Sequence, residues 1–376
     1  MDYPDVISLT QELLAFNTVN PPGNEMEAAQ YTGKLLSENG FEVRYQEYEE
    51  NRQHLVAEKG VSGEGAPLVF SGHFDTVPLG GKFWSRDPFS GVIEGDRIYG
   101  RGSSDMKGGL AAMTVAAIEA TRTAIPQGGI RLIFTSGEEL GCQGISQLVR
   151  SGCRLGKARA VIVGEPTANY PALAHKGALY LKAFCKGKTA HSSMPELGDN
   201  AIYKAARAVL RAEKFRFRAE PDPLLGLPSI NVGKFRGGMN INSVPDLAEF
   251  TMDIRTTTRT PHQAILDRLK RELGEEVVLE TLVDLGPVSN SEADPFIQAV
   301  YQVCGLDGSN TSGPRSLPYL TDGSVLQAYY GGVPTIILGP GEPALAHQTD
   351  EYCSIKRIKQ SVAIYQGIMR NSKNMT

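Results

Sequence analysis

The stretch VFSGHFDTV, residues 69–77, places an apolar run directly before a histidine and an aspartate. Three further apolar runs, 130–136, 158–163 and 335–338, have the length of buried strands and end at glycines. The alanine-rich segment 107–123 between two of them has a helical pattern. Strands that alternate with helices predict an α/β fold with a mixed, mostly parallel sheet, whose ligand sites lie at the carboxyl ends of the strands.

A change of pattern near residue 176 predicts a second domain. A chain of 376 residues exceeds what one ordinary core organises. Alternating strand patterns and two helical segments follow residue 176, which is typical of a small α+β unit, and the α/β pattern returns after residue 287. We therefore expect a main domain of residues 1–176 and 288–376, interrupted by an inserted α+β domain of residues 177–287.

Composition and charge exclude several classes of protein. The 38 Lys and Arg residues against 42 Asp and Glu give a formal net charge of −4, so nucleic acid is not an expected partner. No run of about 18 apolar residues occurs and the N-terminal residues lack a signal-peptide pattern, so we expect no membrane association. Five scattered cysteines without a C-x-x-C pair favour a reducing, cytoplasmic compartment.

Two of the predicted strand and loop ends carry residues that suit a metal site. His73 and Asp75 are two residues apart, so in extended backbone they point to one side, and the Asp75 carboxylate can orient the imidazole while its other nitrogen binds a metal. The alternative is a polar pair that caps a strand. Asp105 lies in the glycine-rich loop GRGSSDMKGG, residues 100–109. Taken alone, Asp105 is better interpreted as a simple N-cap of the helix that follows.

Three more acidic or histidine-bearing segments follow predicted strands. Glu138 and Glu139 come after the strand at 130–136, Glu165 after the strand at 158–163, and His347 beyond the strand at 335–338. Adjacent carboxylates repel unless a positive charge lies between them, and one of the two can serve as a general base with a raised pKa. In isolation the Glu pair is better interpreted as a solvated acidic turn, because exposed Glu-Glu pairs are ordinary. Together the segments supply histidine nitrogens and carboxylate oxygens, which suit a pair of zinc, cobalt or manganese ions.

The motifs GHFDT (72–76), GSSDMKGG (102–109), GEE (137–139), GEP (164–166) and the region of His347 occur in one order along the chain. As a set they resemble the co-catalytic zinc hydrolases that include acetylornithine deacetylase, succinyl-diaminopimelate desuccinylase, aminoacylase and carboxypeptidase G. The resemblance covers essentially the whole chain and implies a zinc-peptidase-like catalytic domain with an inserted lid and dimerisation domain. It also implies a cis peptide between Asp105 and Met106.

The resemblance assigns a role to each of these residues. It implies two zinc ions, for which cobalt or manganese can substitute, with Asp105 as the bridging ligand. His73 and Glu165 would bind one ion, and Glu139 and His347 the other. Glu138 would be the general base, and Asp75 would hold His73 in the ligating tautomer.

The inserted domain contains further residues that match this family. His191, in AHSSMP (190–195), would donate to the developing oxyanion, often across a dimer interface, and the rival interpretation is a surface histidine near a helix start. Asn242 and Arg255 would hold a substrate carboxylate, since arginine binds carboxylates in a bidentate manner. Without the resemblance, Arg255 is interpreted as a structural ion-pair partner. The resemblance also implies a homodimer formed through the inserted domain.

The expected activity is hydrolysis of the amide bond of a small N-acyl amino acid by a water that the two zinc ions activate. A dipeptidase or a glutamate-releasing carboxypeptidase of the same family is the alternative, and the motifs do not separate these because they encode only the shared metal chemistry. A non-catalytic protein with the same fold would be marked by loss of the base or of a ligand, but all are present. No G-x-S-x-G nucleophile motif occurs, which disfavours a serine hydrolase.

Overall fold

The chain divides into two compact units. The computed structural model describes residues 3–61, 65–306 and 315–371. Unit 1 comprises Met1–Ala174, Val288–Arg315 and Thr321–Thr376, and unit 2 comprises His175–Pro287 and Ser316–Leu320. The segment Ser316–Leu320, which the sequence analysis assigned to the main domain, groups with unit 2. In this segment Ser316 Oγ donates a hydrogen bond to the Leu224 carbonyl (2.7 Å).

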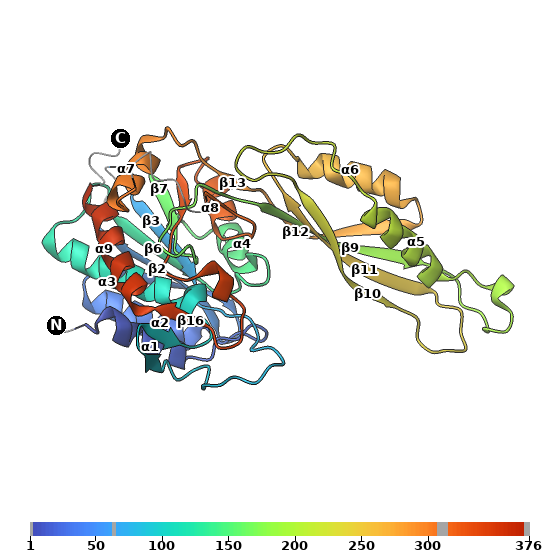
Figure 1. Cartoon of the computed structure of the whole chain (residues 1–376), viewed down its shortest axis with the longest axis horizontal. Coiled ribbons are helices and arrows are strands. Elements are labelled where there is room, and N and C mark those ends of the chain that lie inside the picture. Colours follow the sequence, from blue (N-terminus) through green and yellow to red (C-terminus); the bar gives the residue numbers. More distant parts are fainter. Residues whose placement is uncertain (1–2, 62–64, 307–314, 372–376) are drawn as a thin grey trace. The chain divides into compact units, whose positions relative to one another are not determined.

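Unit 1 is built on a six-stranded mixed sheet (Figure 1). In spatial order its strands are β1 (Glu42–Glu49), β2 (Arg52–Lys59), β6 (Ile130–Thr135), β3 (Leu68–His73), β7 (Ala160–Val163) and β15 (Thr335–Ile337). The pairs β6–β3, β3–β7 and β7–β15 are parallel, whereas the pairs β1–β2 and β2–β6 are antiparallel. The predicted mixed, mostly parallel α/β sheet is confirmed. β3, β6 and β7 are buried along their whole length, as continuous apolar runs require.

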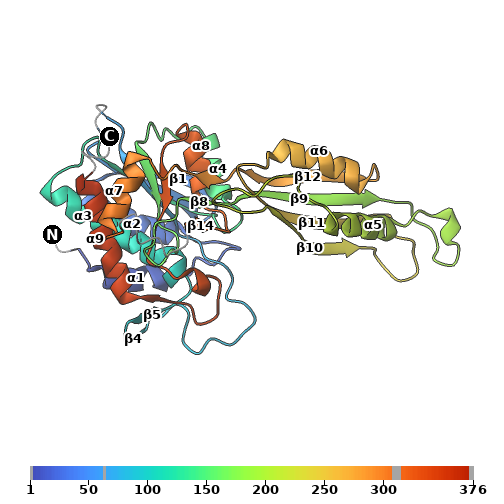
Figure 2. The same ribbon diagram turned by 45° about the horizontal axis from the view of Figure 1, so that its top comes forward.

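Helices cover both faces of this sheet. α3 and α9 pack against each other on one face, and α4 and α8 pack together on the other (Figure 2). The helices of unit 1 are α1 (Val6–Ala15), α2 (Met26–Glu38), α3 (Gly108–Thr123), α4 (Gln143–Arg150), α7 (Pro295–Val303), α8 (Gly323–Tyr329) and α9 (Ile355–Asn371). The alanine-rich α3 is buried on nearly every side, because its small side chains let neighbouring elements approach closely. None of the helices in the described ranges is long and apolar enough to cross a membrane.

Short strands complete the two units. A second, three-stranded sheet in unit 1 has the order β16 (Tyr352–Ser354), β5 (Arg97–Tyr99), β4 (Ile93–Glu94). Three two-residue strands lie where the chain passes between the units: β8 (Ala174–His175), β13 (Val288–Ser289) and β14 (Ser316–Leu317).

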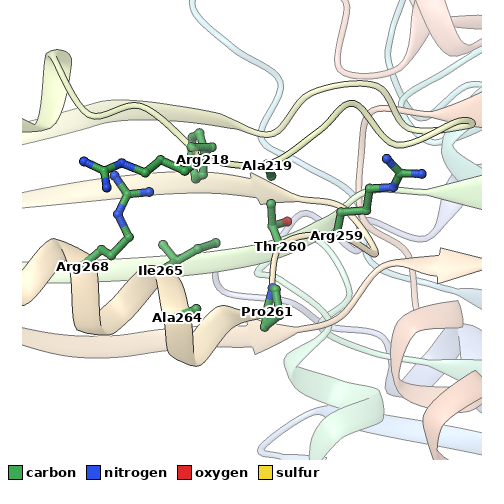
Figure 3. Close-up of a pocket in the computed structure, with 9 residues that line it drawn as sticks. Arg218, Ala219, Arg259, Thr260, Pro261, Ala264, Ile265 and Arg268 are labelled. Atoms are coloured by element: carbon green, nitrogen blue, oxygen red, sulfur yellow. The ribbon is translucent and has the colours of Figure 1, made fainter.

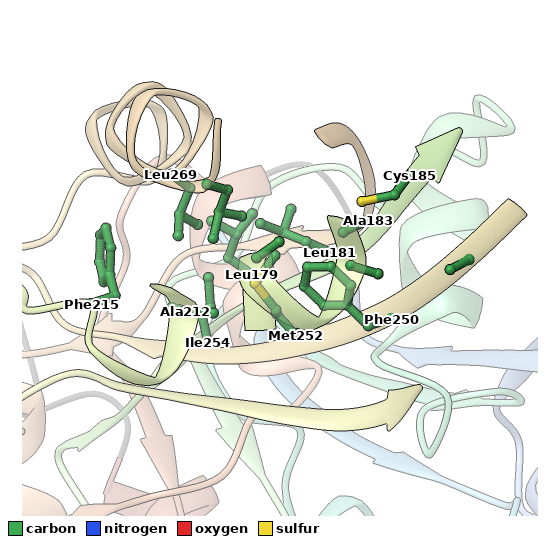
Figure 4. Packing of buried hydrophobic residues seen from close by; sticks show 14 of the residues in the cluster. Leu179, Leu181, Ala183, Cys185, Ala212, Phe215, Phe250, Met252, Ile254 and Leu269 are labelled. Carbon is green, nitrogen blue, oxygen red and sulfur yellow. The ribbon is translucent and has the colours of Figure 1, made fainter. Parts of the chain in front are cut away.

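Unit 2 is a four-stranded antiparallel sheet with two helices on one face. The strand order is β10 (Ser229–Gly237), β11 (Leu247–Thr256), β9 (Gly177–Lys186) and β12 (Val277–Leu285), and the helices are α5 (Ala201–Glu213) and α6 (His262–Leu273). Leu181 of β9, Phe250 of β11 and Leu269 of α6 meet in its core (Figure 4). Burying each of these side chains contributes about 1.5–3 kcal/mol, which makes this core the main source of stability for unit 2.

Candidate metal centre

The parallel strands of unit 1 bring the predicted ligands to one edge of the sheet. His73 is the last residue of β3, and Glu139 and Glu165 follow the ends of β6 and β7. His347 follows β15 after a short loop, and Asp105 lies in the tight turn that leads into α3. Because the carboxyl ends of parallel strands share an edge, five residues spread over 275 positions of the chain meet there (347 minus 73, counted inclusively).

These residues form two donor groups that share one aspartate. His73 Nε2 lies 3.2 Å from Asp105 Oδ1 and 3.5 Å from Glu165 Oε1. His347 Nε2 lies 3.4 Å from Asp105 Oδ2 and 3.2 Å from Glu139 Oε2. Within each group the ligand atoms lie within 4.8 Å of one another. Asp105 therefore turns one carboxylate oxygen to each group, which is the arrangement that a bridging ligand needs.

The turn that carries Asp105 differs from an N-cap. The side chain of Asp105 faces the two histidines, and α3 begins at Gly108 without a side-chain cap. The Asp105–Met106 peptide is cis, the form that the resemblance implies. At the first turn of α3, Gly109 lies so close to β7 that a Cβ there would be 2.5 Å from the Gly164 carbonyl. Only glycine allows this approach, which brings Asp105 near the end of β7 and Glu165.

Asp75 contacts His73 more closely through its main chain than through its side chain. His73 Nδ1 bonds to the backbone carbonyl of Asp75 at 2.8 Å, whereas the nearest oxygen of the Asp75 carboxylate is 3.7 Å away. The carboxylate instead accepts hydrogen bonds from the backbone N–H groups of Gly137, Glu138 and Glu139, at 2.9, 3.1 and 3.1 Å. The Asp75 side chain therefore points towards the loop that follows the neighbouring strand β6. The main chain of Asp75 thus fixes the imidazole, and its side chain fixes the loop that carries both glutamates.

Glu138 stands outside both donor groups and is almost fully buried. Its Oε1 accepts a hydrogen bond from Cys142 Sγ at 3.2 Å. Asp322, also buried, belongs to the same small cluster as Glu138 and Cys142, and accepts a hydrogen bond from the Thr135 hydroxyl at 2.6 Å. The sequence analysis selected neither Cys142 nor Asp322 as a site residue. The position of Cys142, four residues after Glu138, is the one local signal that indicated the contact.

The carboxylates of the centre lie close together, and each affects the pKa of its neighbours. Burial, together with the nearby Asp105 carboxylate, raises the pKa of Glu165 to about 8 and that of Glu139 to about 7. Hydrogen bonds that His347 donates to the Asp105 and Glu139 carboxylates raise its pKa to about 10. Burial also raises the pKa of Glu138 well above its usual range, and the charge of Glu165 adds to this effect. A bound cation would relieve the repulsion between these carboxylates.

The donor set fits two divalent cations. Glu139 Oε1 is buried and has no hydrogen-bond partner among the described residues. Such an atom costs free energy unless a ligand satisfies it. The two histidine nitrogens and the carboxylate oxygens are the ligand types that zinc, cobalt and manganese accept.

The three remaining candidate residues belong to unit 2. His191 is exposed, and its Nδ1 lies 2.7 Å from Ser193 Oγ. The neighbouring Ser192 N donates to the carbonyl of Asn242 at 3.1 Å, so the structure brings the His191 and Asn242 segments side by side. Arg255, on β11, forms an ion pair with Asp253 in which Nε lies 2.8 Å from Oδ1. The ion pair anticipated as the alternative for Arg255 is therefore present.

Unit 2 also contains a shallow cavity of about 150 Å³ beside the N-terminal half of α6 (Figure 3). It is lined by Phe217, Arg218, Ala219, Arg259, Thr260, Pro261, Ala264, Ile265 and Arg268. Arg268 is already engaged, since its guanidinium lies 4.6 Å from the centre of the Phe215 ring and donates to Glu272 at 2.8 Å. None of the predicted site residues lines this cavity.

Known proteins are similar to this chain in sequence and in fold. Residues 69–371 match peptidase family M20/M25/M40. A probable succinyl-diaminopimelate desuccinylase from Staphylococcus epidermidis is 32% identical, with 97% of each chain covered. An acetylornithine deacetylase from Myxococcus xanthus is 29% identical, with 96% of each chain covered. An M20 family metallo-carboxypeptidase from Sulfolobus solfataricus has a TM-score of 0.79 at 20% identity, covering 98% of this chain and 99% of that one.

These similarities define the class of the protein as a metal-dependent hydrolase that acts on amide bonds. The chain belongs to peptidase family M20/M25/M40. A solved structure with the same fold, from Bacillus subtilis, is described as a dinuclear metal-binding peptidase of this family, and it has a TM-score of 0.71 at 16% identity, with 98% of each chain covered.

Proposed function

We propose that the protein hydrolyses the amide bond of a small N-acyl amino acid, using two zinc ions. The observation that carries this proposal is the pair of donor groups that share Asp105, with the unassigned carboxylate of Glu138 buried beside them. His73 and Glu165 would hold one ion, Glu139 and His347 the other, and Asp105 both. The relatives named as a desuccinylase and a deacetylase support an acyl group as the part removed.

The side chains would divide the work of the reaction. When bound, the two ions supply Lewis-acid polarisation and make water more acidic. Glu138 accepts a proton from the attacking water and returns it to the leaving amine, and the Cys142 thiol holds the carboxylate in place for both transfers. His191 donates a hydrogen bond to the negative charge that develops on the carbonyl oxygen.

Substrate carboxylate recognition is assigned to Asn242 and Arg255 of unit 2. The Nε and Nη2 groups of Arg255 contact the Asp253 carboxylate, at 2.8 Å from Oδ1 and 3.1 Å from Oδ2. In this proposal the Nη1 group of Arg255 binds the substrate. A guanidinium fixed in this way loses little conformational freedom when a carboxylate binds. In this proposal unit 2 acts as the lid and unit 1 as the catalytic domain.

Removal and return of metal tests the proposed reaction. Protein treated with a chelator should lose at least about 100-fold of its turnover on a panel of N-acetyl and N-succinyl amino acids, and zinc or cobalt should restore it. Product amine is measured directly, and dipeptides and glutamyl peptides in the panel distinguish the peptidase alternative. Turnover that survives metal removal would contradict the metal assignment. Metal-dependent turnover of the peptides alone would replace the deacylase by a peptidase.

We also propose that two copies of the chain form a homodimer through unit 2. β10 is an edge strand of its sheet and is largely exposed, and an unpaired edge strand is a template for pairing with another chain. α5 packs against β10 and β11, yet its outward-facing Tyr203 and Leu210 are 66% and 57% exposed. Apolar side chains next to an open sheet edge are typical of a surface that a partner covers.

Sedimentation velocity at micromolar concentration tests the homodimer. The wild-type protein should sediment as a dimer, and Leu210→Lys should increase the fraction that sediments as a monomer. Val278→Lys is the matched control, because Val278 is also 57% exposed but lies on β12, at the opposite edge of the same sheet. A wild-type protein that sediments as a single chain contradicts the proposal, and equal effects of the two substitutions contradict the chosen surface.

A further inference from the structure

Glu351 is a fully buried carboxylate that binds the loop of the bridging aspartate. Its Oε1 accepts hydrogen bonds from the backbone N–H groups of Ser104 and Asp105, at 2.8 and 3.0 Å. Its Oε2 accepts from the N–H of Gly102 at 3.0 Å and from Arg101 Nη1 at 2.7 Å. One side chain thus fixes three backbone amides within the turn that presents Asp105.

Arg101, the ion-pair partner of Glu351, is also buried and makes several further contacts. Arg101 is 1% exposed and its guanidinium lies 5.0 Å from the centre of the Trp84 ring. Its Nη2 donates to the carbonyl of Pro78 at 3.2 Å, and its Nη1 also donates to the carbonyl of Gln348 at 3.2 Å. Arg101 therefore connects the Asp105 turn to the residue directly after His347.

These bonds join two parts of the metal centre that are far apart in the sequence. Glu351 and His347 lie four residues apart on one segment, so the carboxylate that orders the Asp105 turn also fixes the position of the His347 segment relative to it. Asp105 must point one oxygen to His73 and the other to His347, at 3.2 and 3.4 Å. A rotation of the Asp105 backbone would shorten one of these distances and lengthen the other.

We infer that Glu351 is a positioning residue that sets the bridging geometry of Asp105 and thereby the affinity of the centre for its second metal ion. The inference rests on the proposed two-metal function. Glu25 provides the contrast within the same unit. It is as completely buried as Glu351 and is also paired with a buried arginine, Arg52, at 2.7 and 2.8 Å. Both glutamates stabilise the fold, but Glu351 alone of the two bonds to the amide of a predicted ligand.

Metal titration of Glu351→Gln tests the inference. The amide keeps the size of the side chain but replaces one acceptor oxygen by an NH₂ group, which opposes the backbone donors. Metal-free protein is titrated with zinc by calorimetry and with cobalt by visible absorption. The weaker of the two sites should lose about 10–100-fold in affinity, and the cobalt spectrum should change, as expected when a group that orients a ligand is altered. Glu25→Gln should lower the melting temperature but leave zinc affinity and the cobalt spectrum within twofold of wild type.

The outcomes separate the inference from the proposed function. If the wild-type protein binds fewer than two metal ions, the proposed function fails. If the wild type binds two ions and Glu351→Gln binds them with unchanged affinity and spectrum, the inference is overturned and Glu351 is only structural. Should Glu351→Gln not fold, Arg101→Lys replaces it. This variant keeps the positive charge but loses the planar guanidinium, and it should weaken the second site by a smaller factor, whereas unchanged affinity again overturns the inference.

Discussion

Glu138→Gln should bind as much zinc as the wild-type protein and hydrolyse its amide substrate about 10²–10⁴-fold more slowly, which is the range that general acid–base groups contribute. Glu138 lies outside both donor groups, so its loss leaves the predicted ligands intact. Glutamine has the same shape but cannot accept a proton from water. Metal content by atomic spectroscopy and kcat on the preferred substrate, measured on the same preparation, provide the test.

Cys142→Ala is the matched control for this prediction. It removes the hydrogen bond to Glu138 Oε1 but keeps the carboxylate, so kcat should fall much less than in Glu138→Gln. Near wild-type turnover in Glu138→Gln contradicts the assignment of the base. A variant that loses one equivalent of zinc together with its turnover indicates that Glu138 is a ligand.

Asp75→Asn should damage the loop of the two glutamates while leaving His73 in place. The imidazole is held by the backbone carbonyl of Asp75, which this substitution does not change. The carboxylate, in contrast, accepts three backbone hydrogen bonds from residues 137–139 and a fourth from Asn20 Nδ2 at 2.9 Å. An asparagine turns an NH₂ group towards part of these donors. We expect a loss of about 3 kcal/mol in the free energy of unfolding and at least about 100-fold in kcat, because the base is displaced.

Asn20→Ala is the control, because it removes a single one of the four donors and should cost only about 1 kcal/mol. Chemical denaturation gives the free energies, and zinc titration reports on the two sites. Asp75→Asn should weaken the site of Glu139 and His347 more than the site of His73 and Glu165. If the substitution weakens the site of His73 first, the side chain acts on the imidazole after all, as the sequence analysis expected.

The sequence determined the positions of the strands and, through them, the candidate ligands. Continuous apolar runs before His73, Glu139 and Glu165 predicted buried parallel strands, and the carboxyl ends of such strands share one edge. The motif order also identified the family that the comparisons show. These features are encoded locally, because strand length and the residue type at its end are read from a few consecutive positions.

The partners of the buried acids were decided only by the tertiary structure. Asp75 was expected to bind the imidazole two residues away, but its side chain binds amides 62–64 positions further along the chain. Glu351 was not selected from the sequence, yet it accepts hydrogen bonds from residues 246–250 positions earlier. A carboxylate accepts from any donor that the fold brings within about 3 Å. Local sequence therefore specifies which groups are present, whereas the distances between remote loops decide which of them meet.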